Sequence, residues 1–260
     1  MSGRDEVLLE PTPPTARLVI DRPAKRNAMT LPMWRLIHEL CAQVADDRRI
    51  RALNLSGAGP SFCAGADISA LAGDDAELKD AVRRAETALR GLPIPTVATI
   101  RGHCWGGGVQ LAVACDLRIA ARDASFALPP ARLGVVYPAE SLRAMTALIG
   151  PSVTKRLIFS GEPIAADEAL RVGLVDAVVA GDDLERFGQE WLSGFGPRSL
   201  LSQSAAKAII NEIVDGGDGS SGYRRYQRAW RNSPDAGEGP AAFLAKRRPD
   251  YTWHPADLDS

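Results

Sequence analysis

The chain has 260 residues, of which 45% are hydrophobic and 24% are charged, and its formal net charge is −1. This length suits one large domain, or a domain with a helical appendage. The near-neutral charge lacks the positive excess that attracts nucleic acid or an anionic membrane surface, so we expect neither partner.

No apolar run is long enough to span a bilayer, and the first residues lack the apolar core of a signal peptide. The four cysteines form no C-x-x-C pair. We therefore expect a cytoplasmic protein with reduced thiols.

The first half of the chain alternates between strand-like and helix-like runs. The predicted strands are Val7–Glu10, Ala16–Asp21, Arg51–Ser56, Pro95–Ile100 and Asp116–Ala121, the first two joined as a hairpin. The predicted helices are Leu31–Ala45, Ala76–Arg90 and Val109–Ala114. Repeated strand–loop–helix units predict an α/β fold with parallel strands and right-handed crossovers.

The second half is mainly helical in pattern. Helices are predicted at Glu140–Ile149, Val153–Phe159 and Ala166–Arg171, followed by one more strand at Leu174–Val179. After Ser199 the pattern is helical throughout, apart from a glycine-rich loop that begins at Asp215.

Two glycine-rich loops, Ser61–Asp67 and Trp105–Gly108, each follow a predicted strand and open a helix-like run. Such turns leave backbone N–H groups unpaired and let a ligand approach the main chain closely. Two of them facing one another could supply two donors to one developing oxyanion. Alternatively, each is a tight turn that only joins two elements.

Several familiar signatures are absent from the sequence. It contains no G-x-x-x-x-G-K-[ST] phosphate loop, no H-E-x-x-H and no G-x-S-x-G nucleophile elbow. The second glycine loop does not spell the nicotinamide-cofactor fingerprint G-x-G-x-x-G. The three histidines have no partner at metal-ligand spacing, so we expect no metal site.

Taken together, seven sequence blocks resemble the crotonase superfamily, also called the enoyl-CoA hydratase/isomerase family. The blocks are Asp21–Ala28, Phe62–Ile68, Gly102–Gly108, Ala114–Ala120, Gly161–Ile164, Glu168–Val175 and Phe243–Arg247. The resemblance implies a spiral of ββα units over residues 1–198 that carries an acyl-CoA site. It also implies a helical region over residues 199–260 that packs homotrimers, often paired into hexamers.

The ligand implied by this resemblance is an acyl-CoA thioester, as in fatty acid metabolism. Coenzyme A would be part of the substrate, and no prosthetic group is expected. The thioester oxygen would lie between the backbone N–H groups of Ala66 and Gly107. Residues expected to contact CoA are Lys25, Arg26 and Ala64, with Phe243 and Lys246 reaching CoA in a neighbouring subunit. The basic side chains could equally be solvated surface charges.

The sequence departs from the family at both catalytic glutamates of its hydratases. Gln110 stands at the first position and Pro130 at the second. Glutamine can orient water but cannot accept its proton at neutral pH, and proline has no polar side-chain group. General acid–base groups contribute about 10²–10⁴ each to rate, so we do not expect the standard two-glutamate hydration mechanism.

Three other readings remain open for the chemistry. The segment around Tyr137 resembles the corresponding part of methylmalonyl-CoA decarboxylase. This resemblance implies that Tyr137, His103 or Arg132 of the present chain would orient a substrate carboxylate. Glu140 could shuttle a proton for double-bond isomerisation, although it could simply be an acid at a helix N-terminus. Tyr137 could likewise be a buried aromatic residue. The chain would then be a crotonase-type lyase or isomerase, or a non-catalytic acyl-CoA-binding oligomer.

Overall fold

The computed structural model describes residues 5–67 and 75–258, and its strands form two sheets. The larger sheet holds β1 (Glu6–Thr12), β2 (Thr15–Asp21), β3 (Ala52–Gly57), β4 (Thr96–Ile100), β6 (Leu117–Ala121) and β9 (Ala177–Val179), in that spatial order. The β1–β2 pair is antiparallel, which confirms the predicted hairpin. The other neighbours pair in parallel, as the repeated strand–loop–helix units predicted.

The smaller sheet consists of β5 (His103–Trp105), β7 (Ser125–Ala127) and β8 (Ile164–Ala165). The sequence patterns predicted none of these strands individually. Two successive ββα turns send their first strand to the large sheet and their second strand to the small one. Thus β4 and β5 precede α3 (Gly107–Ala114), and β6 and β7 precede α4 (Pro130–Leu133). This alternation is the expected spiral of ββα units.

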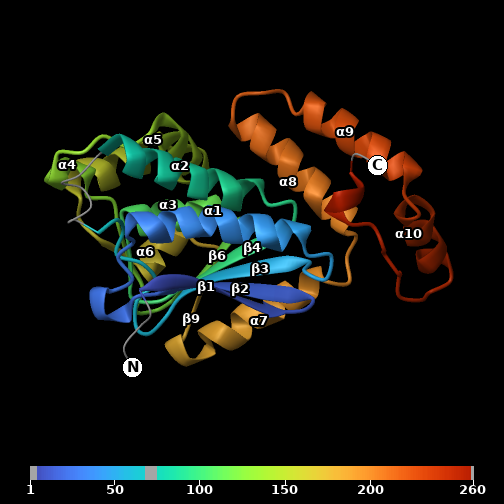
Figure 1. Cartoon of the computed structure of the whole chain (residues 1–260), viewed down its shortest axis with the longest axis horizontal. Coiled ribbons are helices and arrows are strands. Elements are labelled where there is room, and N and C mark those ends of the chain that lie inside the picture. The colour runs from blue at the N-terminus through green and yellow to red at the C-terminus, as the bar shows by residue number, and fades with distance from the viewer. Residues whose placement is uncertain (1–4, 68–74, 259–260) are drawn as a thin grey trace.

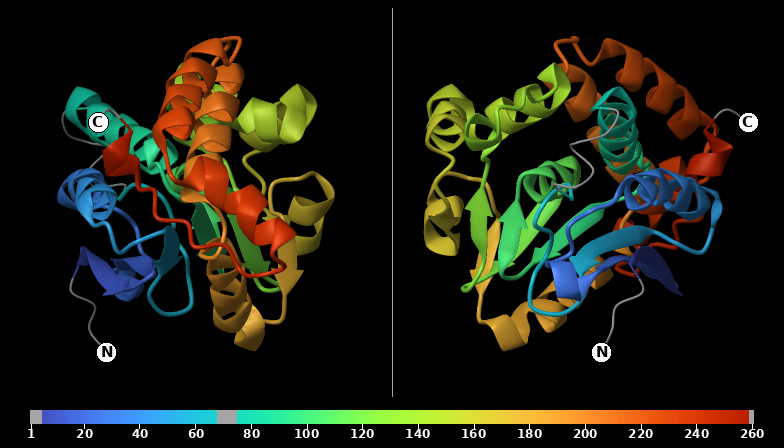
Figure 2. Two further views of the ribbon diagram at one scale, coloured as in Figure 1. Left: turned by 90° about the vertical axis from the view of Figure 1, so that its right-hand side faces the viewer. Right: turned by 60° about the vertical axis from the view of Figure 1, so that its left-hand side comes forward.

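Helices cover both faces of the larger sheet (Figures 1 and 2). On one side lie α1 (Leu31–Asp46), α2 (Asp75–Gly91) and α3, and the main hydrophobic core is between them and the sheet. On the other side α7 (Leu184–Phe195) packs on β3, β4 and β6 through a second, smaller apolar cluster. Side chains of the parallel strands are therefore buried on both faces, as expected for a central parallel sheet.

The remaining helices are α5 (Ala139–Ser160), α6 (Ala166–Arg171), α8 (Leu200–Val214), α9 (Ser220–Asn232) and α10 (Asp235–Leu244). The two predicted helices at 140–149 and 153–159 are the two arms of α5, which bends at Gly150 (φ 74°, ψ 161°). The predicted strand at 174–179 is shorter than expected. Leu174 N and Val175 N both donate to the carbonyl of Ala169, so these residues close the turn after α6 instead of joining the sheet.

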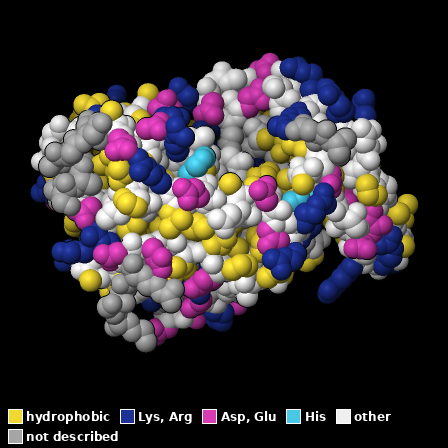
Figure 3. Space-filling view, viewed as in Figure 1, with side chains coloured by type: hydrophobic (Ala, Val, Ile, Leu, Met, Phe, Trp, Pro, Cys, Tyr) yellow, Lys and Arg dark blue, Asp and Glu magenta, His cyan; other side chains and the backbone are white. Residues whose placement is uncertain are grey.

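The three C-terminal helices extend from the side of the sheet domain, with α9 and α10 farthest from the strands (Figure 1). Lys and Arg side chains gather over α9 in the space-filling view (Figure 3). Within residues 5–67 and 75–258, we find no helix with the length and apolar character that crossing a membrane would require. All four cysteines are buried free thiols, in agreement with the predicted reduced state.

Candidate functional site

The two glycine loops lie against one another. Cys63 N donates to the carbonyl of His103 at 2.8 Å, and Trp105 N donates to the carbonyl of Cys63 at 2.9 Å. A Cβ on Gly108 would lie 2.3 Å from Cys63 O, so only glycine permits this approach. Gly65 adopts φ +98°, and a Cβ there would lie 3.2 Å from Gly107 N. The glycines therefore do more than form tight turns: they allow the two loops to pack against one another.

The backbone N–H groups of Ala66 and Gly107, which belong to different loops, have no backbone acceptor among the described residues. Their neighbours are paired, since Asp67 N donates to Met29 O and Gly106 N donates to Ala127 O, both at 2.8 Å. A Cβ built on Gly107 would lie 3.5 Å from Ala66 N, so the two residues are adjacent in space. Preorganised, unpaired N–H groups of this kind can stabilise a developing negative charge.

Both residues line a cavity of about 300 Å³, here called the glycine-loop cavity. Its other walls are largely apolar: Trp34 from α1, Leu78 and Val82 from α2, and Val135 and Val136 after α4. Trp34 is fully buried, and its ring lies 2.8 Å from where a Cβ on Gly107 would stand. The cavity thus combines an apolar chamber with two backbone donors, which is typical of small-molecule sites.

Tyr137 and Gln110 supply polar side chains to this cavity. The Tyr137 hydroxyl would lie 3.4 Å from a Cβ on Gly106, so it is next to the second glycine loop. Burial raises the pKa of Tyr137 well above its usual value, and the charge of Glu86 adds to the effect. The phenol therefore stays protonated at physiological pH and can act as a hydrogen-bond donor.

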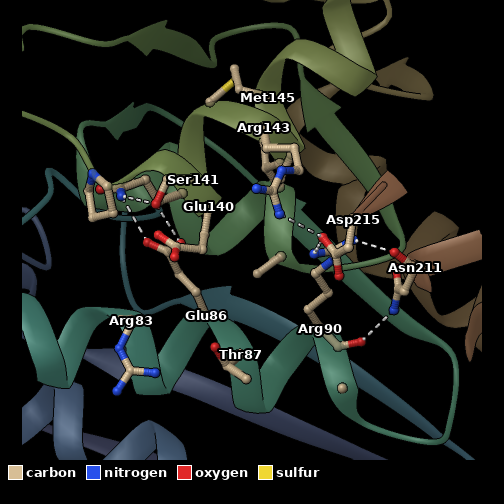
Figure 4. Close-up of a pocket in the computed structure, with 16 residues that line it drawn as sticks. Arg83, Glu86, Thr87, Arg90, Glu140, Ser141, Arg143, Met145, Asn211 and Asp215 are labelled. Carbon is tan, nitrogen blue, oxygen red and sulfur yellow. Dashed lines mark hydrogen bonds and ion pairs between the residues drawn. The ribbon is translucent and has the colours of Figure 1, made fainter. Parts of the chain in front are cut away.

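Gln110 belongs to a closed hydrogen-bonded triangle with Glu86 on α2 and Ser141 on α5. Figure 4 shows the side chains of Glu86 and Ser141 pointing toward one another. Gln110 Nε2 donates to Glu86 Oε1 at 2.8 Å and to Ser141 Oγ at 2.9 Å, and Ser141 Oγ donates to Glu86 Oε2 at 2.7 Å. Removal from water raises the pKa of the Glu86 carboxyl to about 7. The Ser141 hydrogen bond opposes this shift, and the neighbouring charge of Glu140 adds to it.

Glu86 and Glu140 line a second cavity of about 410 Å³, here called the Glu86 cavity. Gln110 and Pro138 line both cavities, so the two spaces meet at these residues. Glu140 is exposed on the first turn of α5 and, among the described residues, makes no hydrogen bond or ion pair. Farther along the Glu86 cavity, Arg90 forms an ion pair with Asp215 at 2.7 Å.

The predicted CoA contacts lie in two places. Lys25 and Arg26 are exposed in a short 3₁₀ turn, and Ala64 N donates to Arg26 O at 3.0 Å, which ties this turn to the glycine-loop cavity. Phe243 near the end of α10 and Lys246 just beyond it are exposed and line neither cavity. Within one chain, the structure does not bring these two residues to the site.

Two residues suggested as carboxylate partners also lie outside the glycine-loop cavity. Arg132 donates to Gly161 O and to Glu162 Oε1 on the surface. The His103 ring lies 3.3 Å from Ser61 Oγ and stacks edge-on against Trp105. Of the three residues named for that role, only Tyr137 lines the glycine-loop cavity.

Sequence reasoning missed Glu86 and Trp34. Glu86 belongs to a helix crowded with charged residues, which is the pattern of a solvated segment. It is half-buried because α3 packs against α2 and because Ser141 of α5 bonds to its carboxylate. Trp34 adjoins the recognised apolar face of α1, so it reads as an ordinary core residue. Helical spacing could have assigned each side chain to a face of its helix. It could not have shown which residues of other elements that face contacts.

The sequence profile of the enoyl-CoA hydratase/isomerase family matches residues 15–254. The chain is 32% identical to carnitinyl-CoA dehydratase from Salmonella arizonae, over 93% of this chain and 96% of that protein. A solved family member from Hyphomonas neptunium superposes with a TM-score of 0.90 at 32% identity, covering 98% of this chain and 100% of that one. An enoyl-CoA hydratase from Bacillus anthracis gives a TM-score of 0.86 at 30% identity, covering 95% and 99%.

These similarities extend over nearly the whole chain and include both glycine loops. The protein belongs to the enoyl-CoA hydratase/isomerase family, and its fold is the crotonase fold.

Proposed function

We propose that this protein is an enzyme that binds an acyl-CoA thioester and stabilises its enolate between the N–H groups of Ala66 and Gly107. The observation that carries the proposal is the pair of adjacent, unpaired N–H groups that line an apolar cavity. An enolate places negative charge on the former thioester oxygen. Removing one preorganised donor of this kind typically costs about 10²–10³ in rate.

The groups around the cavity do not support two-glutamate hydration. The amide of Gln110 occupies the position of the first glutamate, and both hydrogens of its Nε2 are donated to Glu86 and Ser141. Pro130 opens α4 and brings no acid to the site. The chemistry proposed here is therefore formation and reprotonation of an enolate, as in double-bond isomerisation.

Coenzyme A would enter as part of the substrate, with no resident prosthetic group. The exposed Lys25 and Arg26 lie beside Ala64, at the edge of the glycine-loop cavity, where their charges could meet the CoA phosphates. Phe243 and Lys246 could reach the CoA of a neighbouring subunit in a trimer or hexamer.

The test is a mass-spectrometric screen of the purified protein in deuterated water. The panel comprises 2-enoyl, 3-enoyl, saturated, malonyl and methylmalonyl thioesters of CoA. We expect deuterium incorporation into the acyl chain, with bond migration for the 3-enoyl substrates. Addition of water at a typical hydratase rate would contradict the inferred loss of hydration chemistry. Binding without any conversion or exchange would instead indicate a non-catalytic acyl-CoA-binding protein.

A second candidate function is decarboxylation of a malonyl-type thioester. It is favoured by the neutral Tyr137 hydroxyl beside Gly106, which could hold the departing carboxylate out of the thioester plane. Loss of CO₂ yields the enolate directly, so no base is required. Release of CO₂ from malonyl-CoA or methylmalonyl-CoA that disappears in Tyr137→Phe would establish this reading.

A further inference from the structure

Glu86 is hydrogen-bonded to Gln110, which lines the glycine-loop cavity. Its two carboxylate oxygens are held from different elements, by Gln110 of α3 and by Ser141 of α5. It stands one helical turn after Val82, which lines the glycine-loop cavity itself. The carboxylate therefore lies in the Glu86 cavity, next to Gln110, where that cavity meets the glycine-loop cavity, and its orientation is fixed.

The same hydrogen bonds fix the side chain of Gln110. Only its NH₂ end can donate to a carboxylate, so Nε2 faces Glu86 and its carbonyl oxygen points elsewhere. Gln110 lines both cavities, and the space beyond it is the Glu86 cavity. An acyl group that extends past Gln110 would thus meet the Glu86 carboxyl.

Glu86 has no cationic partner within residues 5–67 and 75–258. Arg83 is bound to Asp80, and Arg90 and Arg143 both face Asp215. The charged groups that line the Glu86 cavity are Arg83 and Arg90 from α2, Glu140 and Arg143 from α5, and Asp215 after α8. Tyr137 lies near enough for the charge of Glu86 to raise its pKa. Burial raises the pKa of this Glu86 carboxyl to about 7, and no salt bridge with a described residue opposes the shift, so it can exchange a proton near neutral pH, as a general acid–base group must.

We propose that Glu86 is the catalytic residue that exchanges a proton with the acyl group, replacing the missing family glutamates. The proposal rests on the enolate function proposed above. Glu86 as carboxylate takes a proton from a carbon conjugated to the thioester, and the C–H electron pair moves into the enolate held by Ala66 and Gly107. The protonated acid then returns the proton to a carbon of the same conjugated system. No electrons are gained or lost overall, and no co-reactant is required.

The experiment compares the wild type with Glu86→Gln, using the panel thioester that the wild type exchanges fastest in deuterated water. Glutamine keeps the size of the side chain: its carbonyl oxygen can accept from Gln110, and its amide can donate to Ser141 Oγ, which reverses the bond that Ser141 donates in the wild type. We expect exchange to fall by about 10²–10⁴ while affinity for the same thioester, measured by calorimetry, stays within about threefold. Glu77→Gln is the matched control, because Glu77 lies on the same helix but lines neither cavity. It should exchange like the wild type.

A second variant separates acid–base chemistry from a structural role. Ser141→Ala removes one hydrogen bond that stabilises the Glu86 carboxylate but keeps the acid itself. Exchange by the wild type should rise with pH around an apparent pKa near 7, and in Ser141→Ala this apparent pKa should move upward. A role confined to packing would leave it unchanged.

Three outcomes would overturn the assignment of Glu86. Exchange by Glu86→Gln within threefold of the wild type would remove Glu86 from the chemistry and leave the enolate function intact. A parallel loss of thioester binding in Glu86→Gln would make the residue structural. Thioester binding by the wild type with no exchange across the panel would overturn both this assignment and the proposed enolate chemistry.

Discussion

The carboxyl of Glu86 links the stability of this protein to pH. Its pKa is raised from 4.5 to about 7 in the folded chain, so folding disfavours the charged form. Below about pH 4.5 the acid is neutral in both the folded and unfolded states, and the shift contributes nothing. Between about pH 4.5 and 7 the unfolded chain ionises first, so the free energy of unfolding falls as pH rises.

Glu86→Gln should therefore stabilise the protein at high pH more than at low pH. The difference in unfolding free energy between variant and wild type should grow from pH 4.5 to pH 8, by up to about 3 kcal/mol, and then level off. Chemical denaturation at several pH values measures it. The control is Glu77→Gln, at an exposed position, for which the difference in unfolding free energy should not grow over this pH range. If the difference for Glu86→Gln did not change with pH, burial would not destabilise the charged carboxyl.

Individual residues were unequally predictable from the sequence. The two glycine loops have a local signature, and the family resemblance named Ala66 and Gly107 within them; the structure places these two residues side by side. Glu86 has no such signature. Its environment depends on hydrogen bonds to Gln110 and Ser141, which are 24 and 55 positions away along the chain. Contacts of this range arise only from tertiary packing.

Among the elements, long periodic segments were predicted well and very short ones were not. The apolar face of α1 and the strands β2 to β4 have enough residues to show a period. The strands of the smaller sheet have only two or three residues each, too few for any alternation to be visible. They form because β5 follows β4 and β7 follows β6 into the second sheet, which is a property of the spiral as a whole.

The bend in α5 gives a prediction at the scale of one element. Gly150 has φ 74° and ψ 161°, a region essentially confined to glycine, and a Cβ there would meet no atom within 4 Å. Gly150→Ala should therefore destabilise the protein by about 1–3 kcal/mol through backbone strain alone. Urea unfolding of the purified variant measures this change.

Gly194 of α7 offers the matched control for that substitution. It also has no atom within 4 Å of an added Cβ, but its φ is not positive. Gly194→Ala should stabilise the protein by up to about 1 kcal/mol, since alanine favours the helix. If both alanine variants shifted stability in the same direction, strain at Gly150 would not be the cause of the effect.

At the scale of the whole molecule, the C-terminal helices carry apolar side chains that the single chain leaves uncovered. Phe243 is 83% exposed and Leu244 is 82% exposed at the end of α10, and Tyr223 and Trp230 are also exposed on α9. Large exposed apolar groups close together are typical of interaction surfaces. Because these helices lie to one side of the sheet domain (Figures 1 and 2), they are free to pack against another copy of the chain.

Assembly through α10 can be tested by placing charge on this surface. We expect the wild type to have a mass three or six times the 27.8 kDa of one chain in light scattering. The double variant Phe243→Asp with Leu244→Asp should shift it toward the single-chain mass, because two carboxylates would have to be buried without partners. Phe159→Asp, at a residue 74% exposed on α5, should leave the mass unchanged. If the double variant kept its assembly but bound acyl-CoA more weakly, Phe243 would contact the ligand of a neighbouring subunit without holding the subunits together.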